Sequence, residues 1–424
     1  MPSAISRHVE TLRTRPLVFR SLDRQRLEAA SVHRYLLQSQ VWPCGEASRT
    51  WQHQVDIVRP DSQRPGPVLV LANNRSPCPH PEYADPRVAE ADFDASSLSA
   101  LARDDGCTVI SVAQLPNQPL WLPGSTQPLS EDDLVAASWQ AFMQRSGPDP
   151  WLPLQVPMTA AVIRTIDLWR QLQPEATAGV IVAGLSKRAG AAWLTAMHDP
   201  RVVALASLGL DIHFQAVLAH IRRVFAGEWP AALTPYVQAG ITEVFQTPAF
   251  SRLMRIIDPW AQRHTPEGAR LQLPKLIVNA SGDDFFPPDS PGLYIRDLPP
   301  GLGLQTLPNC DHAGIRRHVV DSLRPFVRRI RHGRPLPATD VDAAPLVAST
   351  ETPLQRIRWQ ASNPRARDFR FSQGVRYHGS PLDRPRRAGP EPDASASGWH
   401  AEYETFHYAD GLQLSTPVRV WHRP

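Results

Sequence analysis

One serine stands where a nucleophile could be built. In GVIVAGLSKRAG, Ser186 directly follows an apolar run and precedes a helical pattern, the strand, turn and helix that a nucleophile elbow requires. Such a turn needs small residues, and Gly184 and Gly190 flank the serine, but Arg188 stands where a second glycine is usual. The segment alone therefore allows two interpretations: a nucleophile, or a serine that only caps the helix.

Two later segments hold residues that could activate this serine. The run KLIVNASGDDFFPPD ends in a turn with Asp283 and Asp284, and Asp283 has the better register, with Asp284 as the alternative. His312 lies in LQTLPNCDHAG, on a loop between a short apolar run and a helical pattern. The chain order Ser, Asp, His is that of the α/β-hydrolases, so the three positions together predict a catalytic triad.

The predicted triad would carry out acyl transfer. His312 would take the proton of Ser186 during attack on an acyl carbon, while Asp283 would hold the imidazole in the correct tautomer and stabilise the imidazolium. No cofactor and no metal enters this chemistry. Cys78, His80 and Glu82 alternate in one segment, but the prolines between them argue against a metal site.

The developing oxyanion needs N–H donors. One donor is expected to be the backbone N–H of Lys187, at the start of the predicted helix, where the helix dipole also favours negative charge. By position, we expect another donor at Asn73 or Asn74, which follow the apolar run VLVLA. The side chains of Lys187 and Arg188 could hold a carboxylate or the oxyanion, or could instead form a solvated or ion-paired first turn.

Apolar runs and helical patterns alternate along the chain, which predicts a parallel, doubly wound sheet covered on both faces. An edge hairpin, formed by WQHQVDIVRP and PVLVLANN, is expected to lead into this sheet. The buried strands are predicted at 107–112, 179–184, 202–208 and 275–280, and the helices at 131–143, 158–172 and 187–198.

The chain is predicted to hold two domains. Two amphipathic helical stretches at about 213–270 interrupt the α/β rhythm and indicate a helical cap, and a segment rich in proline and alanine indicates a linker. Alternating runs after it predict a small β-sandwich. The expected division is 1–35 as an N-terminal extension, 36–333 as the α/β-hydrolase domain, 334–351 as the linker and 352–424 as the β-sandwich.

Composition excludes several classes of protein. The chain has 424 residues, and its 45 basic and 41 acidic residues are scattered, which gives nucleic-acid binding no support. No run approaches 18 apolar residues, so no integral membrane segment is expected. Four widely spaced cysteines without a CxxC pair indicate neither a zinc site nor a disulfide framework. The N-terminus shows no secretory signal, so the chain as it stands is expected to be cytoplasmic.

A set of strings in order along the chain carries a family resemblance: YLLQSQVW, EDDLVAASW, LPLQVPMTAAVIRTIDLW, AGLSKRAGAAWLTAMHDPRVVAL, VNASGDDFFPPDS, LPNCDHAG and GWHAEYETF. Together they resemble the PhoPQ-activated pathogenicity-related proteins, a bacterial family with eukaryotic relatives that act as secreted proliferation repressors. The resemblance runs from about residue 35 to the C-terminus and implies an α/β-hydrolase domain followed by an immunoglobulin-like β-domain. It also implies that Ser186, Lys187 and Arg188 form the family's Ser-Lys-Arg elbow. Relatives often carry export signals, which implies an exported or periplasmic protein, and often have tryptophan where Gly190 stands.

Two classes of function fit these observations. The leading hypothesis is a serine hydrolase that cleaves a small ester or a short peptide or amide, with a cap that excludes large folded proteins. The alternative is a binding or signalling protein that keeps the hydrolase scaffold without turnover. The tail could also bind carbohydrate or mediate assembly through Trp359, Trp399 and Trp421, although their alternating strands favour packing. No role is assigned to Trp121, Trp139, Trp151 or Trp169.

Overall fold

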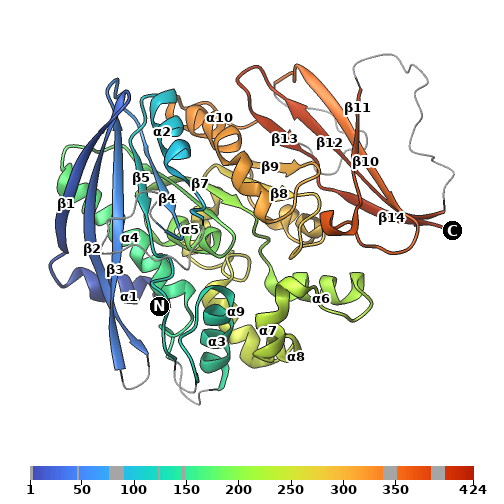
Figure 1. Ribbon diagram of the computed structural model, residues 1–424, viewed down its shortest axis with the longest axis horizontal. Coiled ribbons are helices and arrows are strands. Elements are labelled where there is room, and N and C mark those ends of the chain that lie inside the picture. Colours follow the sequence, from blue (N-terminus) through green and yellow to red (C-terminus); the bar gives the residue numbers. More distant parts are fainter. Residues whose placement is uncertain are drawn as a thin grey trace.

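A nine-stranded mixed sheet crosses the molecule in the order β1-β2-β3-β5-β4-β6-β7-β8-β9 (Figure 1). The computed structural model describes residues 3–44, 47–75, 90–122, 125–144, 149–337, 351–382 and 397–424. Strands β1 to β3 and β5 pair antiparallel, and β5, β4 and β6 to β9 pair parallel. The strands are β1 (Val18–Leu27), β2 (Ala30–Cys44), β3 (Ala47–Pro60), β4 (Val68–Ala72), β5 (Val109–Val112), β6 (Val180–Leu185), β7 (Val202–Leu208), β8 (Lys275–Ala280) and β9 (Leu302–Leu307).

Helices cover both faces of the parallel part of the sheet, so its strands are apolar throughout. In β4, Val70 packs in the core that α4 and α5 close, whereas Leu69 and Leu71 face the core that α2 and α10 close. Side chains alternate between the faces of a strand, and both faces are buried here, which explains the absence of polar alternation. These helices are α2 (Ala95–Asp104), α4 (Gln155–Leu172), α5 (Lys187–His198) and α10 (Val319–Arg331).

The segment between β7 and β8, which is expected from the sequence to form a cap, is helical, and it is called the cap below. Helix α3 (Glu131–Gln144) packs against the cap from the sheet side. The helices α6 and α9 correspond to the two expected amphipathic stretches. The cap contains α6 (Phe214–Val224), α7 (Thr234–Gln238), α8 (Ile241–Val244) and α9 (Pro248–Ile257), and short 3-10 helices lie at Ala231–Leu233, Glu267–Gln272, Ser290–Leu293, Ile295–Asp297, Ala313–His318 and Phe371–Gln373.

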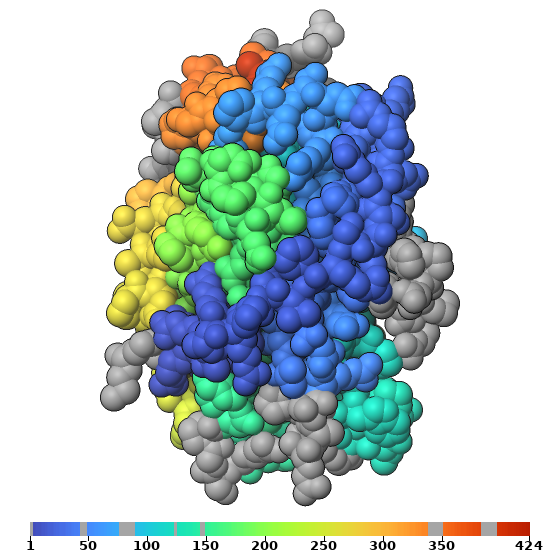
Figure 2. All heavy atoms as spheres, turned by 90° about the vertical axis from the view of Figure 1, so that its left-hand side faces the viewer, coloured from blue at the N-terminus to red at the C-terminus, as the bar shows by residue number. Residues whose placement is uncertain are grey.

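The N-terminal residues differ from the expectation. Residues 1–35 were expected as an extension, but the described part forms α1 (Ala4–Arg13), β1 and the start of β2. Ile5 and Val9 of α1 are buried against α4, and the N-terminal segment crosses one side of the molecule (Figure 2). The edge hairpin is β1 with β2, whereas β3 and β4 do not pair, because β5 lies between them. Alternation identified the strand at 51–60 but not its partners.

The tail contains a small antiparallel sheet in the order β11-β10-β12-β13, with β14 also paired to β12. Its described residues form one sheet, and the immunoglobulin-like sandwich stays a prediction. One of the alternating runs of the tail, FRFSQGVRYH at 369–378, forms a short 3-10 helix and a loop, and only its last residue belongs to a strand, β11. The linker falls mostly outside the described residues. The strands are β10 (Gln355–Asn363), β11 (His378–Pro381), β12 (Gly398–His407), β13 (Gln413–Ser415) and β14 (Arg419–Arg423).

The small sheet packs directly on the hydrolase part of the chain. Phe406, Leu412 and Leu414 are buried in the same core as α10. A Cβ added at Gly303 of β9 would lie 2.8 Å from Leu414 Cδ2, so the two units approach as closely as a glycine allows. The tail is therefore part of one packed body with the large sheet.

Candidate active site

Ser186 occupies a strained turn between β6 and α5. Its backbone has φ 54° and ψ −130°, a conformation that non-glycine residues rarely adopt outside functional sites. A Cβ at Gly184 would stand 2.4 Å from the carbonyl oxygen of Arg188, so the turn requires glycine there. The Ser186 N–H donates to the carbonyl of Leu208 over 2.7 Å, which ties the turn to β7. The turn has the geometry expected of a nucleophile elbow.

The alternative interpretation of Ser186 as a helix cap does not match this geometry. An N-cap residue normally has extended backbone angles, and its side-chain oxygen accepts a bond from the helix start. The Ser186 side chain makes no such bond to α5. Gly190, in contrast, is not required by sterics, because a Cβ there would meet only Leu210 Cδ2, at 3.6 Å.

His312 and Asp283 are hydrogen bonded. The Nδ1 atom of His312 lies 2.8 Å from Oδ2 of Asp283, and the other carboxylate oxygen accepts the backbone N–H groups of Phe285 and Phe286, at 2.7 and 3.1 Å. The carboxylate is buried, and its hydrogen bonds hold it in one orientation. Asp284 instead accepts the hydroxyl of Ser372 over 3.1 Å. Of the two candidate acids, the structure places Asp283 against the histidine.

The remaining ring nitrogen of His312 is buried and makes no hydrogen bond within the described residues. Because Nδ1 faces a carboxylate, it carries the proton, and Nε2 is left as the acceptor. The ring also packs against Phe285, with centroids 4.6 Å apart. This nitrogen is buried and has no polar partner in the described part of the chain, a cost that a substrate or the nucleophile would relieve.

The surroundings of His312 shift its pKa upward. Burial alone would lower the pKa of the imidazole, but the charge of Asp283 and the hydrogen bond to it outweigh burial. The positive charge of Lys187 acts against this rise, because it disfavours the imidazolium. The histidine is therefore a stronger base than a free imidazole.

Burial also raises the pKa of Asp284, the other acid considered from the sequence.

The side chains of Lys187 and Arg188 are held by carboxylates. Lys187 Nζ lies 2.8 Å from Glu131 Oε2 and 3.0 Å from Asp132 Oδ2. Arg188 is buried, with Nη2 at 2.6 Å from Glu131 and Nη1 at 3.2 Å from Asp92. Of the two interpretations open for these cations, the ion-paired first turn is the one found. Glu131 was not singled out from the sequence, yet its charge balances both.

Glu131 itself sits in an unusual conformation at the start of α3. It has a φ of 50°, its N–H donates to Gln118 Oε1 over 2.7 Å, and Gln118 donates back to its carboxylate. Burial would raise the pKa of Glu131, but Arg188 and Lys187 overcome this and hold the pKa far below its usual range. The sequence signal was only an acidic helix start, which is common.

The structure does not support the expected oxyanion donors at Asn73 and Asn74. The backbone N–H of Asn73 donates to Val112 O over 2.9 Å, and that of Asn74 donates to the side chain of Asn73 over 3.0 Å. Both side chains are buried and bind backbone groups of the segment at 90–93. These residues hold a loop in place instead. The N–H of Lys187 remains a candidate, since the first N–H groups of a helix have no acceptor within it.

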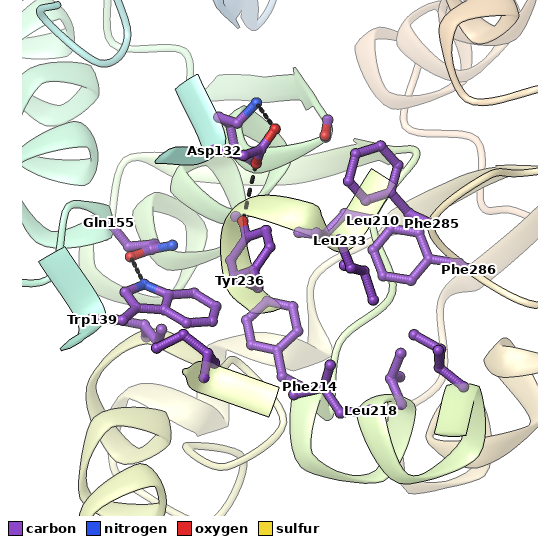
Figure 3. A pocket seen from close by; sticks show the side chains of 17 residues that line it. Asp132, Trp139, Gln155, Leu210, Phe214, Leu218, Leu233, Tyr236, Phe285 and Phe286 are labelled. Carbon is purple, nitrogen blue, oxygen red and sulfur yellow. Dashed lines mark hydrogen bonds and ion pairs between the residues drawn. The ribbon is translucent and has the colours of Figure 1, made fainter. Parts of the chain in front are cut away.

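An apolar pocket opens beside the elbow, under the cap (Figure 3). It encloses about 780 Å³, counted out to its open mouth. Polar groups are few, and Tyr236 donates to Asp132 over 3.0 Å. Trp139, to which we assigned no role, lines the pocket beside Gln155. The lining residues are Asp132, Trp139, Gln155, Ser186, Lys187, Gly190, Leu210, Phe214, Val217, Leu218, Ile221, Leu233, Tyr236, Ile241, Ile257, Phe285 and Phe286.

Loops next to the acid and the base are held by the tail. The N–H of Phe371 donates to Gly282 O over 2.9 Å, beside Asp283. Asn309, three residues before His312, exchanges two hydrogen bonds with the backbone of Tyr377, at 2.7 and 2.9 Å. The tryptophans of the tail mostly pack within their own sheet, as Trp359 does on Tyr403, with centroids 6.4 Å apart.

The described residues hold no cluster of three or more histidine, cysteine, aspartate or glutamate side chains that could bind a metal. The segment with Cys78, His80 and Glu82 lies outside them. In the same described part of the chain, no helix is both long and apolar enough to cross a bilayer.

A parallel sheet with an elbow after β6, an acid after β8 and a histidine after β9 defines an α/β-hydrolase fold. Two solved structures share this fold. Acetyl xylan esterase 1 from Thermoanaerobacterium sp. JW/SL YS485 is 13% identical with a TM-score of 0.50, covering 73% of this chain and 86% of that chain. The acetyl xylan esterase from Paenibacillus sp. R4 is 14% identical with a TM-score of 0.50, covering 77% and 92%.

The chain belongs to the PhoPQ-activated pathogenicity-related protein family, whose model matches residues 5–370. This confirms the resemblance seen in the sequence. A relative, autocrine proliferation repressor protein A of Dictyostelium discoideum, is 27% identical over 310 residues. The match covers 71% of this chain, and the chain spans about 60% of the length of that relative.

Proposed function

We propose that this protein is a serine hydrolase in which Ser186 is the nucleophile, His312 the base and Asp283 the acid that orients the base. The observation that carries the proposal is the hydrogen bond from His312 Nδ1 to Asp283. This bond fixes the tautomer and leaves a buried, unpartnered Nε2 to accept a proton. The strained turn at Ser186 is a second, independent feature of such a site.

The proposed reaction proceeds through an acyl-enzyme. Ser186 Oγ attacks the acyl carbon while its proton passes to His312 Nε2, and the carbonyl oxygen becomes an oxyanion. The backbone N–H of Lys187 stabilises that charge at the start of α5, where the helix dipole adds to the effect. His312 then protonates the departing alcohol or amine, which leaves the acyl group bound to Ser186. Water next attacks this acyl-enzyme while His312 takes its proton, and return of that proton to Ser186 Oγ releases the carboxylic acid.

The pocket supports a small substrate, either an ester or a short peptide or amide. Its walls include residues of the cap together with Phe285 and Phe286, which follow the proposed catalytic acid Asp283 in the chain. Concave, mostly apolar sites with a few polar groups bind single small molecules rather than folded proteins. The exported or periplasmic location implied by the family stays a prediction.

A fluorophosphonate probe tests the nucleophile directly. Wild-type protein is expected to be labelled at Ser186, and labelling should be lost in Ser186→Ala and be strongly slowed in His312→Ala. Ser96→Ala changes a serine of helix α2 and serves as the matched control, with labelling like the wild type. Folded wild-type protein that takes up no probe, with circular dichroism showing native structure, would refute the hydrolase proposal.

A second candidate function is binding or signalling on the hydrolase scaffold without turnover. It is favoured by the absence of a hydrogen bond at His312 Nε2, which no described residue supplies, Ser186 included. Catalytic hydrogen bonds often tighten only when substrate is bound, so the geometry alone does not separate the two functions. The labelling experiment does, because a pure binding protein has no activated serine.

A further inference from the structure

The pocket contains a hydrogen-bond donor whose direction is fixed. Trp139 Nε1 donates to Gln155 Oε1 over 2.9 Å, deep beneath the cap. An indole nitrogen can only donate, so the amide oxygen of Gln155 must face the tryptophan. The amide nitrogen then points the other way, into the pocket (Figure 3). Both side chains are 5% exposed, so bulk water reaches neither freely.

The amide nitrogen of Gln155 has no hydrogen-bond acceptor among the residues that the structure describes. Apart from Ser186, the other polar side chains of the wall are already engaged: Asp132 accepts Tyr236, and Lys187 lies between Asp132 and Glu131. Around them the wall is aliphatic or aromatic. The residue is largely buried and its amide nitrogen is open only to the pocket, so this position favours a ligand that supplies an acceptor.

We propose that the substrate has an apolar acyl chain that bears a neutral hydrogen-bond acceptor, a ketone or ether oxygen, which binds Gln155 Nε2. The inference rests on the proposed function, because it concerns the acyl chain of the ester that Ser186 attacks. Gln155 is then a specificity residue and takes no part in the proton transfers. A carboxylate is disfavoured as the acceptor, because the cation of the pocket wall, Lys187, is already paired with two carboxylates.

Binding to the Ser186→Ala protein tests this inference without turnover. Methyl heptanoate is compared with its oxo derivatives, which carry a ketone at successive chain positions, by isothermal titration calorimetry. One derivative is expected to lose about tenfold in affinity when Gln155 is changed to Met in the Ser186→Ala background. Methyl heptanoate should bind equally well or more tightly after that change, since methionine is apolar and of similar length.

Two further variants separate the hydrogen bond from a change of shape. Leu218→Met alters an apolar wall residue and is expected to leave the ratio of the two affinities unchanged. Trp139→Phe removes the N–H that fixes the amide, so the oxygen of Gln155 can turn toward the pocket. The preference for the ketone is then expected to shrink.

The outcomes distinguish this inference from the proposed function. Equal loss of affinity for both ligands on Gln155→Met, or no binding of either, overturns the inference even if fluorophosphonate still labels Ser186. Selective ketone binding in a protein that fluorophosphonate does not label supports the role of Gln155 and refutes the hydrolase proposal instead.

Discussion

The ring of His312 lies against the backbone of Gly209, where a Cβ would stand 3.2 Å from the histidine Cε1. Gly209 follows β7 with φ +61°, and the carbonyl of the residue before it, Leu208, accepts the N–H of Ser186. The end of β7 therefore supports the serine through a hydrogen bond and the histidine through contact. Ser186 and His312 are positioned by the same strand end.

Gly209→Ala is expected to impair catalysis more than stability. The added methyl group would stand 2.9 Å from Ile315 Cδ1 and 3.2 Å from His312 Cε1, so the imidazole would have to shift by a few tenths of an ångström. The positive φ adds a backbone cost of about 1 kcal/mol. Gly333→Ala is the matched control, because Gly333 has φ +63° and no atom of the described residues lies within 4 Å of its added Cβ. Similar losses of stability in urea, with esterase activity lost only at Gly209, would agree with this prediction, whereas equal activity in both variants would contradict it.

Asp283→Asn should lower kcat/KM by about 10³-fold or more, because the amide no longer selects the productive tautomer of His312. The side-chain oxygen of asparagine can still accept the N–H groups of Phe285 and Phe286, so the fold should survive. Asp284→Asn is the control and should lose little activity, since Asp284 binds Ser372. Hydrolysis of p-nitrophenyl acetate measures both variants. A larger loss at Asp284 would assign the acid role to it.

The pH dependence follows from the raised pKa of His312. The base must be neutral to accept a proton, so kcat/KM is expected to fall as pH drops through a value above 6.5, the ordinary histidine pKa. Lys187→Met removes a positive charge that lowers this pKa, and should move the acid limb to still higher pH. Asp283→Asn should move it to lower pH. A limb that shifts in the opposite direction in either variant would argue against His312 as the base.

The sequence was sufficient for the parts of the site that depend on chain order. Strands buried on both faces are apolar without interruption, and the strand ends of a parallel sheet meet at one edge. Thus the pattern of apolar runs alone places Ser186, Asp283 and His312 at strand ends. The family match confirms the resemblance, and the helical cap was predicted from two amphipathic stretches. The catalytic roles of these residues stay proposals.

Other features depend on contacts that local patterns do not encode. The partner of Lys187 and Arg188 is Glu131, which is more than 50 residues away in the chain. Asn73 and Asn74 follow the expected strand, but their N–H groups are used by neighbouring groups. The pairing of Trp139 with Gln155 joins two helices. Spacing along the chain gives no information about any of these contacts.

Arg188→Met and Lys187→Met should have different effects. Arg188 is buried, so its loss leaves Asp92 and Glu131 with fewer partners and should cost about 3 kcal/mol in the free energy of unfolding. Lys187 lines the pocket, and its loss should change KM and the pH profile more than stability. Chemical denaturation and steady-state kinetics on both variants check the contrast. Two variants equal in stability would contradict the structural role given to Arg188.

Asn309 links the tail to the loop that carries His312. Its side chain donates to Tyr377 O and accepts the Tyr377 N–H, and its backbone has φ 52°, a conformation that asparagine tolerates well. Asn309→Gly keeps the backbone freedom and removes the side chain, so it isolates the two hydrogen bonds. Asn309→Ala also adds backbone strain.

If the tail positions His312, Asn309→Gly should slow fluorophosphonate labelling severalfold and shift the acid limb of the pH profile. The loss of two hydrogen bonds should cost about 2 kcal/mol in the free energy of unfolding. Asn363→Gly is the control, because the side chain of Asn363 bonds only to tail residues, at Asp368 O and the N–H groups of Arg365 and Ala366, among the residues that the structure describes. Reduced stability with unchanged labelling and pH profile in Asn309→Gly would show that the tail only packs on the hydrolase domain and does not position the base.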